Sequence, residues 1–338
     1  MKRKNTILIF FVASLLLFSA CDVEFSPNAE WKEVPVLYCV LDQDDDTTWV
    51  RVEKCFLGDG NMYQYGTISD SLNYPAGSIS VKFYAYQNGR CVDTDVCNYT
   101  VKDREDGAFA NRAQPLYYTT NPLNENYMYK LVVTRVSDNT VLAYTDSIPL
   151  ITWYDPDGYS PITKPDNGKG FGFYDRNGNT PVCKMIWKSL DNARMYQPVV
   201  RFYYGEEGDT HYVDLRCPIV TDNDDRISFS TNYPLPSFLS ELKTLLVDDP
   251  QPKDYLHKVD VYLTACSEDL NAYISSTDIV GGIDQGREVY TNIHNGVGVF
   301  ASRRTHIYKP LSADNSQNPL GTPNPGLLAY LKSLQIGF

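Results

Sequence analysis

Apolar and polar residues alternate with a period of two along several stretches of the chain. Between residues 79 and 86 the odd positions are apolar and the even positions are Ser, Lys or Tyr, and residues 259–265 follow a similar pattern. A period of two is typical of a β-strand that packs one face on a core. Denser apolar runs at 127–136 and 198–204 predict strands buried on both faces. Because turn-forming pairs such as Asn88-Gly89 separate these segments, the pattern predicts a mostly β protein with antiparallel strands.

The predicted strands fall into two segments. Residues 31–150 hold about seven strands at the spacing of a sandwich, which predicts an N-terminal antiparallel β-sandwich of immunoglobulin or fibronectin type. Residues 151–181 are rich in Gly and Pro and form either a linker or a long functional loop. Residues 182–338 are predicted to form a second β-rich domain with a few short helices. Helix candidates follow Ser237 and Ser267, whose side chains suit the N-cap position, and a third covers residues 327–334.

The first residues predict export and lipid attachment. Three basic residues after Met1 precede an apolar stretch at 7–18, which is shorter than the roughly 20 residues that span a bilayer. The stretch ends in Ser19-Ala20-Cys21 and resembles the lipobox of bacterial lipoproteins, in which the Cys thiol is acylated. Residues 1–20 are therefore interpreted as a signal peptide, Cys21 as the lipidated residue and residues 21–30 as a lipidated tether. An ordinary cleavable signal with an incidental Cys is the alternative.

Composition indicates a globular protein of acidic character. Hydrophobic residues make up 43% and charged residues 21% of the 338 residues, which is typical of folded chains. The net charge is −12, and loss of the signal peptide removes three basic and no acidic residues, which leaves −15. Such a charge disfavours nucleic acid and anionic lipid headgroups as partners. Membrane contact is therefore expected through the acyl chains, each buried CH₂ of which contributes about 0.8 kcal/mol.

Signatures of catalysis are absent from the sequence. The 4 His residues show no metal-ligand spacing, and neither a GxSxG elbow nor a P-loop occurs. With 42 acidic residues, some pair always meets the needs of a glycosidase, so carboxylates single out no site. A non-catalytic protein without a cofactor is expected. Calcium is a side hypothesis, because Asp175, Asn177 and Asn179 have the one-three-five spacing of a calcium loop, although Thr180 stands where that loop needs Gly.

Seven cysteines follow Cys21, and none has CxxC spacing. Most lie in apolar, strand-like contexts and are expected to be small buried hydrophobic residues. Cys91 and Cys97 are the pair whose proximity in sequence suggests a bridge.

Tyrosine is the over-represented residue type that suits binding, with 26 Tyr against 14 Phe and 4 Trp. A Tyr ring offers an apolar face and a hydroxyl, which fits sugars and protein partners alike. High strand propensity explains most of these residues. Tyr63, Tyr65, Tyr154 and Tyr159 fall in predicted loops, where binding residues concentrate, and they are the candidate ligand-binding residues.

Three stretches of the chain carry a family resemblance. They are PVLYCVLD at 35–42, VRVEKCFLGDG at 50–60 and YTNIHNGVGVF at 290–300, of which the last is the most specific. From about residue 31 onward the chain resembles a family of Bacteroidetes lipoproteins that carry a domain of unknown function and are often encoded beside TonB-dependent outer-membrane receptors. Read from its residues alone, the last stretch predicts a strand in which glycines permit a tight bend or close backbone approach, while Val297, Val299 and Phe300 pack.

The resemblance implies a location and a neighbourhood but no chemistry, because the family has no established activity. It implies a non-catalytic lipoprotein of the outer membrane, facing the periplasm or the cell surface, that serves a TonB-dependent nutrient-uptake system as a binding accessory. Its partners are then the receptor and a glycan or peptide ligand. The alternative is an independent surface polysaccharide-binding or adhesive lipoprotein. Ser71 and Ser147 are glycosylation candidates, because each lies in an Asp-Ser-apolar triplet like those that Bacteroidetes O-glycosylate in exported proteins.

Overall fold

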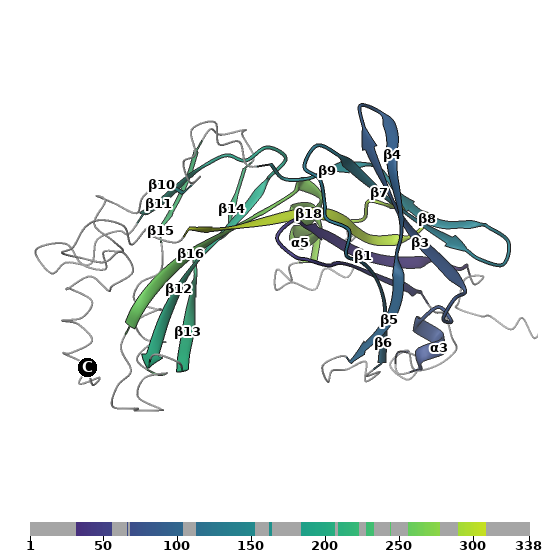
Figure 1. The fold of residues 1–338 in the computed structure, drawn as a ribbon, viewed down its shortest axis with the longest axis horizontal. Coiled ribbons are helices and arrows are strands. Elements are labelled where there is room, and N and C mark those ends of the chain that lie inside the picture. Colours follow the sequence, from purple (N-terminus) through teal and green to yellow (C-terminus); the bar gives the residue numbers. More distant parts are fainter. Residues whose placement is uncertain are drawn as a thin grey trace, which may run out of the picture.

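The computed structural model describes residues 32–55, 66, 68–103, 113–152, 162–163, 184–206, 209–222, 228–232, 244, 256–277 and 290–308. Strands make up most of this part of the chain, which confirms the prediction of a mostly β protein (Figure 1). Helices α3 (Ser69–Leu72) and α5 (Glu268–Thr277) are also present. The helix predicted after Ser267 is α5, whereas Ser237 and residues 327–334 lie outside the described part.

Two sheets built from the first half of the chain face each other across one core. One contains the strand order β1-β2-β6-β5 and the other β8-β7-β3-β4. In immunoglobulin-type sandwiches, strands A-B-E-D form one sheet and strands G-F-C form the other, with an added C′ strand in some. The two strand orders of this protein correspond to that arrangement. Side chains of both sheets meet in a buried cluster that includes Leu37, Val50, Phe83 and Leu131. The strands are β1 (Pro35–Asp42), β2 (Thr48–Lys54), β3 (Ile79–Gln87), β4 (Arg90–Val96), β5 (Asn98–Asp103), β6 (Ala113–Thr119), β7 (Met128–Arg135), β8 (Val141–Thr145) and β9 (Ile148–Pro149).

The alternating pattern of the sequence corresponds to the inward and outward faces of these strands. On β3 the odd-numbered apolar residues from Ile79 to Ala85 are all buried, as predicted. The prediction of strands buried on both faces is wrong for the dense run at 127–136. There β7 turns Leu131 and Val133 to the core and leaves Met128 exposed, because its sheet has one face on the core.

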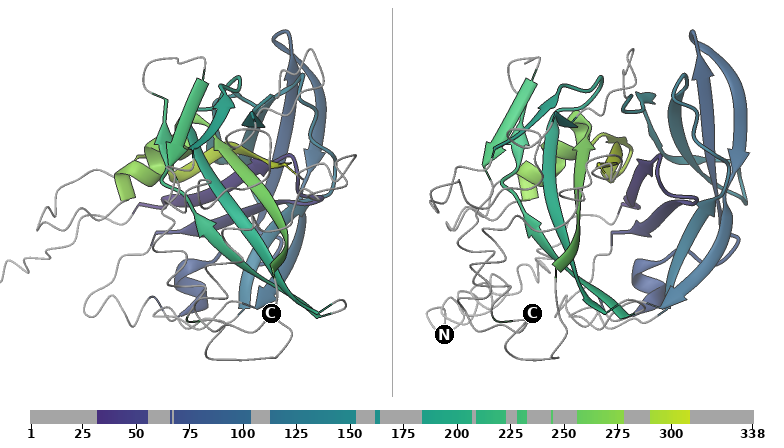
Figure 2. Two further views of the ribbon diagram at one scale, coloured as in Figure 1. Left: turned by 90° about the vertical axis from the view of Figure 1, so that its left-hand side faces the viewer. Right: turned by 60° about the vertical axis from the view of Figure 1, so that its left-hand side comes forward.

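Strand β18 joins the two halves of the molecule. After β17 (Ile293–His294) pairs with β8, β18 (Val297–Tyr308) runs parallel to β1 over 7 residue pairs and then pairs antiparallel with β16. Figures 1 and 2 show this yellow strand passing from the N-terminal sheets to the green strands. The sequence assigned residues 182–338 to a separate domain, yet residues 293–303 complete the N-terminal sheets at β8 and β1. The stretch 151–181 therefore does not divide one sheet from another.

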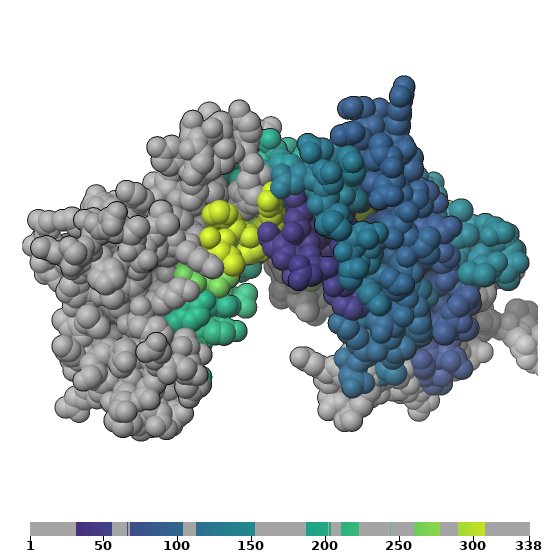
Figure 3. Space-filling view, viewed as in Figure 1, coloured from purple at the N-terminus to yellow at the C-terminus, as the bar shows by residue number. Residues whose placement is uncertain are grey.

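The sheet that contains β1 and β2 continues beyond β18 through β16, β12 and β13, and β14 pairs with β12. Helix α5 covers one face of this sheet where Leu270 packs against Met195, Cys266, Val299 and Ala301. In Figure 3 the purple and blue residues of the N-terminal sheets form one continuous surface, which the green and yellow residues adjoin. The remaining strands are β12 (Met195–Glu206), β13 (Asp209–Arg216), β14 (Val220–Thr221) and β16 (Leu256–Cys266), and a separate three-stranded sheet of β10 (Ile162–Thr163), β11 (Lys184–Lys188) and β15 (Ser228–Asn232).

The stretch at 290–300 attaches β18 to the N-terminal sheets. The Asn292 side chain accepts a hydrogen bond from the Phe300 N–H at 2.9 Å and donates one to the Phe300 carbonyl at 2.7 Å. Gly298 has a φ of 123°, and a Cβ there would lie 1.9 Å from the Leu37 carbonyl oxygen, so the predicted close backbone approach is confirmed. Phe300 is fully buried, as predicted. Val297, by contrast, is 39% exposed, because the cluster under α5 begins on β18 only at Val299.

The described cysteines are free thiols. Cys39, Cys217 and Cys266 are buried, as expected from their apolar contexts, and burial raises the pKa of Cys217 to about 12 and that of Cys266 to about 11. The bridge suggested for Cys91 and Cys97 is not formed. Cys91 lies near the start of the extended strand β4 and Cys97 directly follows its end, so the two residues are about 20 Å apart along it, which is too far for a disulfide.

Candidate ligand-binding pocket

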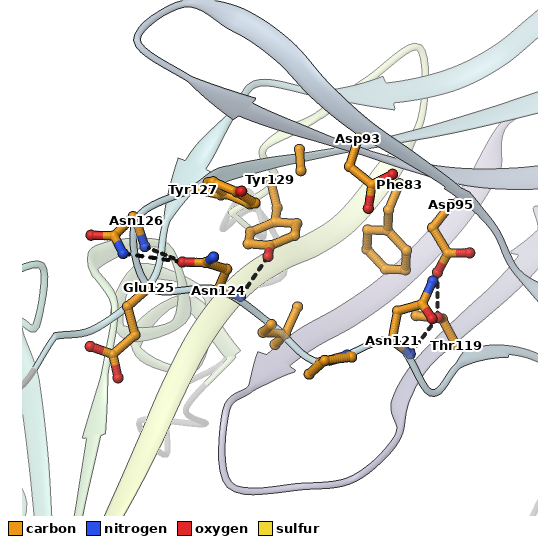
Figure 4. A pocket seen from close by; sticks show the side chains of 13 residues that line it. Phe83, Asp93, Asp95, Thr119, Asn121, Asn124, Glu125, Asn126, Tyr127 and Tyr129 are labelled. Atoms are coloured by element: carbon orange, nitrogen blue, oxygen red, sulfur yellow. Dashed lines mark hydrogen bonds between the residues drawn. The ribbon is translucent and has the colours of Figure 1, made fainter.

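An open pocket lies at one end of the N-terminal sheets, between β3, β4 and the segment that leads from β6 to β7 (Figure 4). Its volume is about 490 Å³, which is within the range of small-molecule sites. Three kinds of side chain in its lining suit contact with a ligand. The carboxylates are Asp93, Asp95 and Glu125, the amides are Asn121, Asn124 and Asn126, and the aromatic rings are Phe83, Tyr127 and Tyr129.

Strand β4 turns two carboxylates towards the core side of its sheet. Asp93 lies opposite Ala85 and Asp95 opposite Phe83 in the antiparallel register with β3, and directly opposed residues share a face. Ala85 and Phe83 are 6% and 4% exposed and belong to the core. The apolar residue Val96 points to the other face and is 54% exposed. The usual inward and outward pattern is therefore inverted on β4, and the gap between the sheets stays open there.

Hydrogen bonds hold the carboxylates in place but leave acceptor positions unused. The Thr119 hydroxyl donates to Asp95, and Thr119 Oγ1 accepts the backbone N–H of Asn121 at 3.1 Å. Asp93 Oδ1 accepts the backbone N–H of Thr94 at 2.8 Å. Because a carboxylate offers about four acceptor sites, both residues can still accept bonds from a ligand.

The segment 120–127 forms the opposite wall and is ordered by its own hydrogen bonds. The Asn124 N–H donates to the Tyr129 hydroxyl at 2.7 Å, and the Asn126 N–H donates to Asn124 Oδ1 at 3.0 Å. Glu125 forms an ion pair of 2.6 Å with Arg304 on β18. Burial raises the pKa of Tyr129, so its hydroxyl is neutral at physiological pH. The wall is therefore preorganised and tied to the strand that joins the two halves of the molecule.

The electrostatics of the pocket favour ligands with hydrogen-bond donors over ligands with acceptors. Its lining carries three carboxylates and no Lys, Arg or His, and Arg304 on β18 neutralises Glu125. Asp93 and Asp95 thus leave a local negative charge beside the apolar faces of Phe83, Tyr127 and Tyr129. Such a site fits a ligand with hydroxyl or ammonium donors on one side and an apolar face on the other, and it repels anions.

Inward-pointing carboxylates also have a structural interpretation. Charges on an edge strand oppose pairing with the edge of another sheet, and β4 is the last strand of its sheet among the described residues. That role needs a charge on the edge strand but no facing wall. The ordered segment 120–127 and the rings below the carboxylates are what distinguish a pocket from a protected edge.

A second hollow of about 510 Å³ lies where α5 begins, between β9 and residues 189–194. Its polar groups are used by the fold. Asp269 accepts a hydrogen bond from the Tyr290 hydroxyl at 2.6 Å, and Ser267 Oγ accepts the Ser302 N–H at 3.2 Å. These bonds fasten α5 to β18 and to the chain before β17, so this hollow is a weaker candidate for a ligand site.

Of the sequence-predicted site residues, only Ser71 and Ser147 belong to the described part of the chain, and neither lines the pocket. Ser71 lies in α3, where its N–H donates to the Ile68 carbonyl at 3.0 Å, and Ser147 lies half-buried between β8 and β9. The remaining candidates lie outside the described residues. They are the lipidation residue Cys21, the tyrosines Tyr63, Tyr65, Tyr154 and Tyr159, and the calcium candidates Asp175, Asn177 and Asn179.

Sequence reasoning missed Asp93 and Asp95, although the sequence contains a signal for them. Residues 92–96 read Val-Asp-Thr-Asp-Val, an alternation in which the carboxylates take one face of the strand. The pairing with β3 was needed to tell that this face is the inner one. Within the described ranges, no group of three or more His, Cys, Asp or Glu side chains is arranged to hold a metal ion.

Comparison with known proteins gives no indication of the function of this chain. No family model and no curated protein matches this chain. No helix in the described part of the chain is long and apolar enough to cross a membrane.

Proposed function

We propose that this protein is a non-catalytic lipoprotein, anchored at the outer membrane through Cys21, that serves as a binding accessory of a TonB-dependent nutrient-uptake system. The pocket between β4 and the segment 120–127 is its ligand site. The lipobox-like sequence before Cys21 supports the anchor, and the resemblance of residues 35–42, 50–60 and 290–300 supports the association with a receptor.

The position of the pocket relative to the N-terminus is the observation that carries the proposal. The tether enters β1 at Pro35, which lies opposite Lys54 of β2. The pocket residue Thr119 lies opposite Thr48, at the other end of β2, about 20 Å away along the strand. The pocket therefore lies at the end of β2 remote from Pro35, the first residue of β1. This separation supports a pocket that a ligand and a receptor can reach while the protein is held at its N-terminus.

The lining defines the class of ligand. Unused carboxylate acceptors on Asp93 and Asp95 pair with hydroxyl or ammonium groups, and the rings of Tyr127 and Tyr129 cover an apolar face. Neutral sugars, amino sugars and basic peptides meet these needs, whereas acidic sugars and acidic peptides place like charges together.

A thermal-shift titration tests the pocket. Neutral sugars, amino sugars and the amides of Lys and Arg are to be added at millimolar concentration to the wild type, the Asp93→Asn/Asp95→Asn variant and the Asp103→Asn variant. Asp103 lies on β5 outside the pocket, so Asp103→Asn controls for the loss of a charge. We expect at least one compound class to raise the Tm of the wild type and of Asp103→Asn but not of the pocket variant. Equal shifts in all three proteins, or no shift with any compound, contradict the assignment.

A pull-down of the acylated protein from its native membrane, followed by mass spectrometry, tests the accessory role. We expect a TonB-dependent receptor to co-purify with the wild type. Binding to a glycan array with no receptor partner supports the alternative function, an independent surface polysaccharide-binding or adhesive lipoprotein. The Cys21→Ser variant is the control for the anchor, and its release from the membrane fraction is expected.

A further inference from the structure

A cluster of tyrosines surrounds Arg201 on one face of β13, β12 and β16, where Tyr212 is exposed and Tyr203 and Tyr262 are half-buried. Tyr203 on β12 lies opposite Tyr212 on β13. Tyr262 on β16 lies opposite Val199, the residue of β12 that precedes Arg201 on the same face. The other face of these strands is buried, as Val200 shows with 0% exposure. Three adjacent strands, spaced about 4.8 Å apart, thus contribute rings to one face.

The guanidinium of Arg201 fixes this cluster. Its Cζ lies 3.8 Å from the ring centroid of Tyr212 and 4.7 Å from that of Tyr262. Its Nε and Nη2 donate to the two carboxylate oxygens of Asp214 at 2.7 and 2.9 Å. The hydroxyls of Tyr203 and Tyr262 are hydrogen-bonded at 3.2 Å. The rings are therefore held in position before any ligand arrives.

Arg201 lies between two carboxylates, Asp214 on β13 and Asp260 on β16, and Asp260 is only 1% exposed. Much of the surface that the cluster exposes is aromatic. The side chains of Arg201 and Asp214 are only 25% and 20% exposed and neutralise each other in a bidentate pair. Tyr212 remains 54% exposed although the guanidinium lies over its ring. Ile307 of β18, which lies opposite Tyr262, is 41% exposed and extends the apolar surface. Arg216 is exposed on the same face, at the end of β13.

We propose that this face, defined by Arg201, Tyr203, Tyr212 and Tyr262 and named the tyrosine platform, binds a neutral polysaccharide chain. The C–H faces of sugar rings stack on aromatic rings, and sugar hydroxyls bond to the tyrosine hydroxyls. Rings from adjacent strands match a ligand of several linked sugars better than a single sugar. Fixed rings lose little conformational freedom on binding, which favours affinity.

Charge pairing decides between neutral and acidic chains. Because Asp214 neutralises Arg201, an acidic polymer finds no unpaired cation among the four residues of the platform. The exposed Arg216 lies at the edge of the platform, where a solvent-screened charge contributes little. The tyrosine platform is a different site from the pocket at β4, and the proposal does not rest on the uptake role.

Affinity electrophoresis of the full chain tests the proposal. Native gels are to contain soluble neutral polysaccharides, including galactomannan, xyloglucan, mixed-linkage glucan, mannan and dextran, with pectin as the acidic counterpart. The variants are Tyr212→Ser, which removes the exposed ring, Tyr212→Phe, which keeps it, and Tyr99→Ser. Tyr99 is 40% exposed on β5 and serves as a matched control outside the platform.

We expect at least one neutral polysaccharide to retard the wild type. Tyr212→Ser is expected to weaken that interaction roughly tenfold, the loss typical of removing an aromatic contact residue. Tyr212→Phe, which keeps the stacking ring and loses one hydroxyl, is expected to weaken it less, and Tyr99→Ser is expected to keep it. An unchanged Tm of Tyr212→Ser shows that the fold is intact, and the Asp93→Asn/Asp95→Asn variant separates this site from the pocket. Three outcomes overturn the proposal: no retardation by any neutral chain, retardation by pectin alone, or equal retardation of wild type and Tyr212→Ser.

Discussion

Replacing Gly298 by Ala tests how closely β18 is held against β1. Gly298 has a φ of 123°, which L residues rarely adopt, and an added Cβ would lie 1.9 Å from the oxygen and 2.8 Å from the carbon of the Leu37 carbonyl. Both atoms belong to the backbone, so no side chain can rotate away from the new methyl group. We expect the two strands to separate around this residue.

The magnitude follows from two contributions. A residue held in such a backbone conformation is strained by about 1–3 kcal/mol. Separation of the strands also loosens Phe300, which is 0% exposed and whose full burial contributes roughly 1.5–3 kcal/mol. We therefore expect Gly298→Ala to lower the free energy of unfolding by about 3–5 kcal/mol, a large part of the roughly 5–15 kcal/mol typical of a folded domain.

Urea unfolding followed by tryptophan fluorescence measures this loss as a shift of the midpoint at constant slope. Gly89→Ala is the matched control. Gly89 has a φ of 77°, but an added Cβ meets nothing within 4 Å, so this variant carries the strain without the clash and should lose only about 1–2 kcal/mol. If Gly298→Ala loses no more than Gly89→Ala, the close approach of β18 to β1 is not as described.

Two further predictions concern stability. Asn292→Ala removes both hydrogen bonds to the Phe300 backbone, at 2.9 and 2.7 Å, and should lower the free energy of unfolding by about 1–3 kcal/mol in the same urea assay, whereas the exposed Asn126→Ala should have a smaller effect. In reducing buffer, stability should fall as pH rises from about 9 towards 11, because burial raises the pKa of Cys266 from 9.0 to about 11 and the unfolded chain loses the proton first. Cys266→Ala should reduce the slope of stability against pH by roughly 1 kcal/mol per pH unit in this window, and an unchanged slope refutes the assignment.

Local patterns in the sequence account for the strands, some turns and one helix. The alternation at 79–86 became β3, and α5 begins directly after Ser267, where a helix was predicted. The glycines near Val297 predicted a close backbone approach, which Gly298 makes against Leu37. These features succeed because alternation, helix periodicity and glycine conformation depend on neighbours within a few residues.

The candidate sites could not be predicted in the same way. Asp93 and Asp95 look like ordinary polar positions until the register with β3 identifies their face as the inner one. Arg201 and Tyr262 are 61 positions apart, and only the pairing of β12 with β16 brings their side chains together.

The sequence by itself determined the β class and the identity of most strands, and it predicts an exported, lipid-anchored protein through residues 1–21. The tertiary structure alone decided that β18 returns to run parallel to β1, that β4 presents its carboxylates to the core side, and that tyrosines from three strands share one face. The physical reason is that alternation along a strand specifies two faces but neither its partner nor its register. A shift of one residue would turn Asp93 and Asp95 to the outer face.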